Sequence, residues 1–264
     1  MPRTKISSAP VSPAGSSARE AALGGLVAIH QPNLFPRLST LAKLFAADCW
    51  IVLDDVQFAR RDFQHRARLA AMSGSAQRQW LSLPTHLPHG RSTLIRDAVL
   101  ADHERSRRRV ASMLPQYYAV SPDWPLLRPE LDCVLARFHD RAGTADVAEE
   151  STKVLLRLLG WKGRIVRSSL LPARRGRSER LADLAANVGA CGYLCGTGGM
   201  RYLQDKPFAE HGVSVVPFRM PLVGVWRDAR DVSAVAPLME HGIASVADQA
   251  RDVAARHRAL ISST

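Results

Sequence analysis

The sequence predicts an α/β fold with three layers: a mainly parallel central sheet, helices on both of its faces, and a mixed insertion. Two short apolar runs, at residues 26–29 and 50–53, enclose a segment of helix length, which is the pattern of a β-α-β unit. The first run is apolar at every position, as in strands buried on both faces. After residue 160, strands and helices alternate again.

The first β-α-β unit is the most clearly patterned part of the chain. Pro32 and Pro36 restrict the loop after the first strand and delay the helix until about residue 38. Within the helix, apolar residues recur at steps of three and four and predict a core face made by Leu38, Leu41, Leu44 and Phe45. Lys43 is expected to lie off that face.

The remaining elements follow from apolar spacing, caps and glycines. We expect strands at 79–88 and 94–99, helices at 102–118 (capped by Asp102), 130–138 and 146–159, a strand at 164–168, a helix at 178–188, a strand at 192–195, a helix from about 200, a strand from 213 and a helical tail from 232. Residues 1–24, rich in Ser, Ala and Pro, predict a disordered tail. Residues 25–264 are expected to form one domain, with about 75–160 as an insertion or cap.

Composition narrows the function classes. The 36 Lys and Arg against 24 Asp and Glu give a net charge of +12, which suits anionic small molecules or an acidic protein. Nucleic acid is not the expected partner, because no helix-turn-helix, zinc-finger or aromatic RNA-binding signature is present. The four cysteines have no metal-ligand spacing, so no metal site is predicted. No apolar run approaches a membrane span, and the cytoplasm is the expected location.

Polar residues gather where the predicted strands end. These are His30, Gln31 and Asn33 after the first strand, Asp54, Asp55 and Gln57 after the second, and the turn Gly196, Thr197, Gly198 and Gly199 after a later one. In open parallel sheets, ligands bind at the carboxyl ends of the strands. We therefore expect the three groups to meet at one edge. The glycine turn either presents amide groups to an anion or simply makes a tight turn.

Four arginines lie within nine residues after the second strand: Arg60, Arg61, Arg66 and Arg68. Arginine binds phosphate or carboxylate through two parallel hydrogen bonds, so these residues form a candidate anion-binding cluster. A solvated, ion-paired edge is the alternative.

Several motifs together identify a family. IHQPNLFP begins at Ile29, DDVQF at Asp54 and FQHRAR at Phe63, and WLSLP, RIVRSSLL and YLCGTGGMRYL follow. The chain resembles the WbqC-like proteins over most of residues 26–242. The resemblance places Lys43 and Gln64 among the substrate-binding candidates. His65 and Ala67 depart from the family pattern, which has asparagine at both positions, and these departures suggest a divergent pocket.

The resemblance implies a biosynthetic enzyme of an O-antigen, other surface-polysaccharide or natural-product pathway. The first hypothesis is acyl or aminoacyl transfer that forms an amide or ester, with catalytic candidates His30, Asp54, Asp55 and Gln57 and with arginines holding the donor's anionic end. The donor would be an adenylate made with ATP and Mg²⁺, or a phosphopantetheine thioester on a carrier protein.

Two other classes stay open. One is a nucleotidyl or phosphosugar transferase with phosphate at the glycine turn. The other is a non-catalytic protein that binds an acidic carrier protein through the arginines of residues 105–109. A nucleophilic Cys195 beside the turn is a lesser alternative. The sequence does not indicate the substrate or the oligomeric state.

Overall fold

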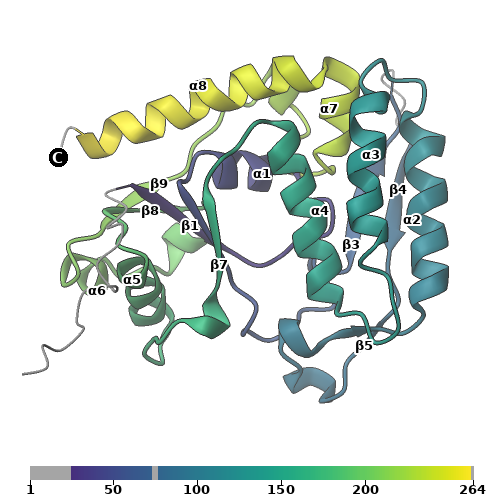
Figure 1. Ribbon diagram of the computed structural model, residues 1–264. Coiled ribbons are helices and arrows are strands. Elements are labelled where there is room, and N and C mark those ends of the chain that lie inside the picture. The colour runs from purple at the N-terminus through teal and green to yellow at the C-terminus, as the bar shows by residue number, and fades with distance from the viewer. Residues whose placement is uncertain (1–24, 73–76, 263–264) are drawn as a thin grey trace, which may run out of the picture.

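The computed structural model describes residues 25–72 and 77–262, so the predicted tail lies outside the described residues. Five parallel strands form the central sheet in the order β7-β2-β1-β8-β9 (Figure 1). They are β1 (Leu26–His30), β2 (Cys49–Val52), β7 (Arg164–Arg167), β8 (Gly192–Cys195) and β9 (Ser214–Pro217). Because all five are parallel, their carboxyl ends lie at one edge. The α/β fold predicted from the sequence is confirmed.

Helices cover both faces of the sheet. Leu26 and Ala28 of β1 join a large core that includes residues of three helices, α1 (Leu38–Phe45), α4 (Thr144–Leu158) and α8 (Ile243–Ser262). Val27 and Ile29 point to the opposite face and a smaller core with α5 (Arg177–Asn187) and α6 (Lys206–Ala209). This alternation is the two-residue period of a strand buried on both sides.

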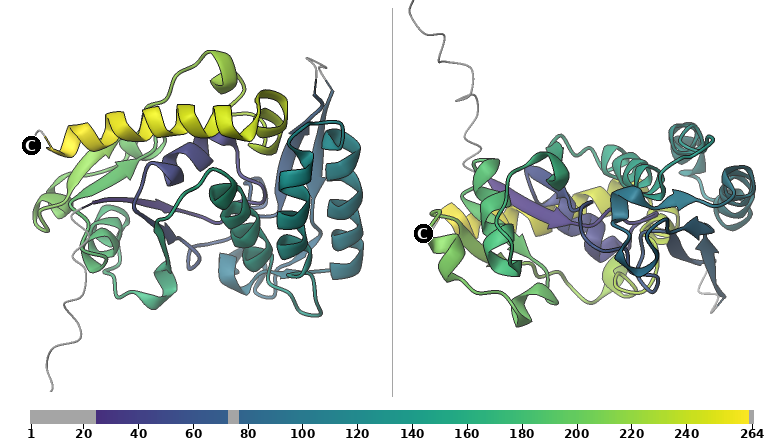
Figure 2. Two further views of the ribbon diagram at one scale, coloured as in Figure 1. Left: turned by 45° about the horizontal axis from the view of Figure 1, so that its top comes forward. Right: turned by 90° about the horizontal axis from the view of Figure 1, so that it is seen from below.

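The chain between β2 and α4 builds a side structure next to the sheet. Its elements are the antiparallel pair β3 (Arg66–Ala70) and β4 (Arg78–Ser82), the short pair β5 (Thr85–His86) and β6 (Val99–Leu100), and the helices α2 (His103–Tyr118) and α3 (Trp124–Leu135). Figure 2 shows these elements, coloured blue to teal, together at one end of the molecule. The amide of Arg105 donates to Asp102, which caps α2 as expected.

Some element predictions were wrong. Residues 94–99 contain a 3-10 turn (Ile95–Asp97) and the start of β6 instead of one strand. The helix expected from about residue 200 is a single 3-10 turn, Gly199–Arg201. Helix α3 starts at Trp124, before the predicted 130, because Pro125 fits the first helical turn without losing a hydrogen bond.

The C-terminal tail is helical as predicted. It consists of α7 (Val235–His241) and α8, joined at Gly242 with a positive φ of 87°. Three further 3-10 turns complete the described elements: Gly90–Ser92, Ser168–Leu170 and Gly224–Trp226. No helix of the described chain is both long and apolar enough to cross a bilayer.

Candidate functional site

A cavity of about 390 Å³ lies at the carboxyl ends of β1, β8 and β9. Its wall combines the end of β1, the start of α1, the glycine turn and the segments after β9. The residues are His30, Arg37, Ser39, Thr40, Lys43, Tyr193, Gly196, Thr197, Gly198, Gly199, Phe218, Met220 and Arg230. Three of them are cationic, and no Asp or Glu is among them. This composition favours an anionic ligand.

His30 is the last residue of β1, and its ring is held in one tautomer. Nδ1 lies 2.7 Å from the carbonyl oxygen of Gln31. Because a carbonyl only accepts, Nδ1 carries the proton and donates, which leaves Nε2 with its lone pair. Burial and then the positive charge of Lys43 lower the pKa of His30 from 6.5 to about 3. The imidazole is therefore neutral at pH 7.

Lys43 lies off the apolar stripe of α1, but it is buried instead of exposed to solvent. Its side chain is only 6% exposed and lines the cavity. Nζ donates a weak hydrogen bond of 3.4 Å to the carbonyl of Ile29. None of the ion pairs found among the described residues includes Lys43, and burial lowers its pKa from 10.5 to about 8. An amine buried without a carboxylate is the arrangement that an incoming anion would complete.

Arg37 and Arg230 are cavity residues that the sequence reasoning missed. Arg37 packs over the ring of Phe63 at 4.0 Å, and its Nη1 donates to the carbonyl of Arg230 at 2.9 Å. Its Nε is buried without a hydrogen-bond partner in the described chain. Burial lowers the pKa of Arg37, with Asp62 and Asp231 opposing that shift. The position of Arg37 at the end of the HQPNLFPR loop was the one sequence feature that could have indicated its place in the cavity. No feature of the sequence near Arg230 indicated that it lies there.

The glycine turn after β8 lies in the cavity wall. The amides of Gly199 and Met200 already donate to the carbonyl of Gly196, at 2.9 and 3.2 Å. In the described residues the amides of Thr197 and Gly198 donate to no protein group, so they remain for a ligand. A Cβ on Gly199 would lie 2.7 Å from the sulfur of Cys195, so a larger residue here would force the buried Cys195 side chain to move.

The loop after β1 is fixed from two sides. Gln64, fully buried, donates from Nε2 to Oε1 of Gln31 at 2.5 Å. The Asn33 carbonyl accepts from Thr152 of α4 at 3.0 Å. Phe35 has a positive φ of 39°, which is strained for a residue with a Cβ. Gln31, Asn33 and Gln64 therefore lie beside His30 but outside the cavity wall, where they support the loop.

Asp54 and Asp55 lie at the same sheet edge but face β7 rather than the cavity. Buried Asp54 accepts two hydrogen bonds from Ser169, one from its amide (3.0 Å) and one from its hydroxyl (2.7 Å). The Ser168 hydroxyl lies 3.1 Å from Asp54 and closer to Asp55, and its single proton is shared between the two carboxylates. Asp55 also forms an ion pair with Arg180. Gln57 is exposed and donates to the Arg91 carbonyl. None of these candidates lines the cavity.

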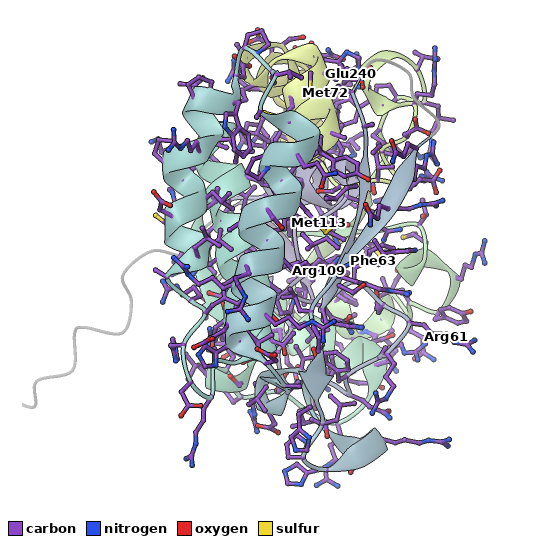
Figure 3. All side chains as sticks on the ribbon, turned by 90° about the vertical axis from the view of Figure 1, so that its right-hand side faces the viewer. Arg61, Phe63, Met72, Arg109, Met113 and Glu240 are labelled. Carbon is purple, nitrogen blue, oxygen red and sulfur yellow. The ribbon has the colours of Figure 1, made fainter. Side chains whose placement is uncertain are left out.

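The arginine cluster after β2 does not gather in the cavity either. Arg61 is exposed and lies at the periphery in Figure 3. Arg66 donates to the Asp62 carbonyl and packs over Trp80 at 4.4 Å, and Arg68 belongs to β3. Arg60 lines a different pocket with His65 and Arg109. Burial, followed by the charges of Arg66 and Arg60, lowers the pKa of His65 to about 4.

Neither a metal site nor a cysteine nucleophile is supported by the described residues. No group of three His, Cys, Asp or Glu side chains there could hold a metal ion. Cys195 is fully buried, and burial raises the pKa of its thiol. A buried protonated thiol is a poor nucleophile.

The WbqC-like family model matches residues 31–231 of the chain. The uncharacterized protein Rv1507c of Mycobacterium tuberculosis is 24% identical over 199 residues, which is 73% of this chain and 81% of that protein. No solved structure matches. The matched segment runs from the loop that orients His30 to the segment after β9 that carries Arg230, and the chain therefore belongs to the WbqC-like protein family.

Proposed function

We propose that this protein is a group-transfer enzyme that forms an amide or ester by acyl or aminoacyl transfer, using a donor with an anionic end. The observation that carries the proposal is the cavity itself. It brings Arg37, Lys43 and Arg230 together with the glycine turn, contains no carboxylate, and places a neutral histidine beside them. The arginines and the lysine would hold phosphate or carboxylate oxygens.

His30 would receive the proton of the acceptor. The Nε2 lone pair takes a proton from an amine or hydroxyl nucleophile as its nitrogen or oxygen forms a bond to the acyl carbon. The bond from that carbon to the leaving group breaks, and the leaving group departs with the electron pair. The proton on His30 then passes to the departing anion or to water. Lys43 and the amides of the turn would stabilise the negative charge on the leaving group.

Donor binding would also prepare His30 for this role. With the cavity empty, a pKa of about 3 makes the imidazole a weak base. Part of that depression comes from the positive charges of Lys43 and Arg37. A bound anion would offset these charges and raise the pKa of His30, while the larger lowering caused by burial would remain. Base strength would then depend on donor binding.

Nucleotidyl or phosphosugar transfer is the second candidate. It is favoured by the free amides of Thr197 and Gly198 at the cavity, which suit a phosphate group. A nucleotide titration with and without Mg²⁺ tests it, and saturable binding that needs the nucleoside part would support this candidate over acyl transfer. The roles predicted for Asp54 and Asp55 in either reaction remain predictions.

Binding and transfer can be measured separately. The protein is incubated with acyl phosphates, acyl adenylates or acyl thioesters and a panel of amine and hydroxyl acceptors, and products are detected by mass spectrometry. Lys43→Met is expected to abolish binding of the donor, while His30→Asn is expected to retain binding and lose transfer by at least about 100-fold. Lys162→Met, at an exposed lysine, is the matched control. Full transfer by His30→Asn would refute the proposed role of His30.

A further inference from the structure

A second hollow, larger than the cavity, lies next to it. It measures about 620 Å³ and is bounded by the chain after β9 and by the C-terminal half of α8. Carbon-rich side chains form its wall: Pro217, Met220, Pro221, Val253 and Leu260. We call this hollow the apolar groove. Arg219 and Arg256 also border it, and their charge disfavours a cationic ligand.

Met220 is common to the cavity and the apolar groove. The two hollows are therefore neighbours on either side of this one side chain. Methionine is unbranched and flexible, so it adapts to a ligand that passes it. One molecule could place a polar group at Lys43 and an apolar group between Pro221 and Leu260.

The loop that carries Met220 is firmly attached to α8. Nδ1 of His257 lies 2.7 Å from the Val253 carbonyl and donates to it, so Nε2 is free to accept the Arg219 amide at 2.9 Å. The ring of His257 also stacks on Phe218 with centroids 4.8 Å apart. Because Phe218 belongs to the cavity wall and His257 to the groove wall, this stacking contact connects the two hollows.

We infer that the apolar groove binds the hydrocarbon chain of a substrate whose anionic end occupies the cavity. This inference rests on the proposed function and specifies its donor as an amphiphile: a phosphate- or carboxylate-bearing head with an alkyl or acyl chain. Three features carry it, namely continuity through Met220, the absence of carboxylates in the cavity wall, and the carbon-rich groove.

Isothermal titration with two alkyl phosphates tests the inference. Ethyl phosphate reaches only the cavity, whereas octyl phosphate, kept at monomeric concentrations, adds six methylene groups. Each fully buried methylene contributes up to about fourfold in affinity, so partial burial predicts that octyl phosphate binds at least about 50-fold more tightly. Leu260→Asp places a charge in the groove and is expected to remove most of that gain without weakening ethyl phosphate.

Leu126→Asp is the matched control, because Leu126 on α3 is 57% exposed and Leu260 is 56% exposed. It should leave both affinities unchanged. If ethyl phosphate binds and Lys43→Met abolishes that binding, but octyl phosphate gains nothing, the groove inference fails and the anion site stands. An equal loss of the gain in both Asp variants also overturns it. If neither phosphate binds, the anion site and the groove inference fall together.

Discussion

Replacing Lys43 with methionine is expected to stabilise the protein at pH 7. The side chain is 6% exposed, and none of the ion pairs in the described chain includes it. Burial lowers its pKa from 10.5 to about 8, and at about 1.4 kcal/mol per unit the charged amine costs the folded state about 3 kcal/mol. Methionine has a similar length and no charge. Loss of the weak bond to the Ile29 carbonyl offsets about 1 kcal/mol, which leaves a net gain of about 2 kcal/mol.

The gain should depend on pH. Between pH 8 and 10.5 the unfolded chain binds the Lys43 proton more tightly than the folded protein does, because the folded pKa is the lower one. Wild-type stability therefore rises with pH over that interval relative to Lys43→Met. By pH 10 most of the advantage of methionine should have disappeared.

Urea unfolding at pH 7 and pH 10, followed by circular dichroism, measures both effects. Lys162→Met, at an exposed position, should change the unfolding free energy by less than about 0.5 kcal/mol at either pH. A Lys43→Met protein that is less stable than wild type at pH 7 would refute the reasoning, since the amine would then make a stronger interaction than the one at 3.4 Å.

Three further outcomes follow from the structure. The pKa of His30 is about 3 in the folded protein and 6.5 as a free side chain, so the stability that neutral His30 contributes is complete above pH 6.5 and declines toward pH 3. In urea unfolding, the wild-type protein should therefore lose about 1–2 kcal/mol more than His30→Gln between pH 7 and pH 5. Equal losses in the two proteins would contradict this prediction. Gly199→Ala places a Cβ 2.7 Å from the Cys195 sulfur and should lower the free energy of unfolding by about 1–3 kcal/mol. Combining it with Cys195→Ala should recover part of that loss. If the losses of the two single variants simply add in the double variant, the contact with Cys195 is not the cause. Asp54→Ala removes the acceptor of two hydrogen bonds from Ser169 and should cost about 2–4 kcal/mol in thermal unfolding while phosphate affinity stays unchanged. Weaker phosphate binding in a folded variant would indicate a role for Asp54 in the site.

The fold was predictable because its signals are local. Within ten residues, each of three patterns predicts the structure of its own segment: the apolar runs of β1 and β2, the proline-limited loop, and the apolar stripe of α1. Errors occurred where local signals compete, as at residues 94–99, where a 3-10 turn replaces a strand. The glycine turn was recognised, but the helix expected after it was not formed.

The site was harder to predict because it depends on contacts between distant segments. Arg37 and Arg230 are 193 residues apart and meet through one hydrogen bond. Lys43 is off the apolar stripe of α1, and a helical pattern alone would place it in solvent. Only the packing of β8 beside β1 places the glycine turn against that side of the helix. The partners of Asp54 likewise come from the chain after β7.

Strand order explains why His30 and the glycine turn share a cavity while the acidic pair does not. From β1, the chain continues to β2 and β7 on one side, and β8 and β9 are added on the other. The order therefore reverses between β1 and β8, and ligands of open α/β sheets bind at such a reversal. On the β2–β7 side, the acidic pair finds its hydrogen-bond partners in Ser168 and Ser169 of the chain after β7. On the other side, the cationic cavity lies between the β1–α1 segment, which carries His30 and Lys43, and the glycine turn that follows β8.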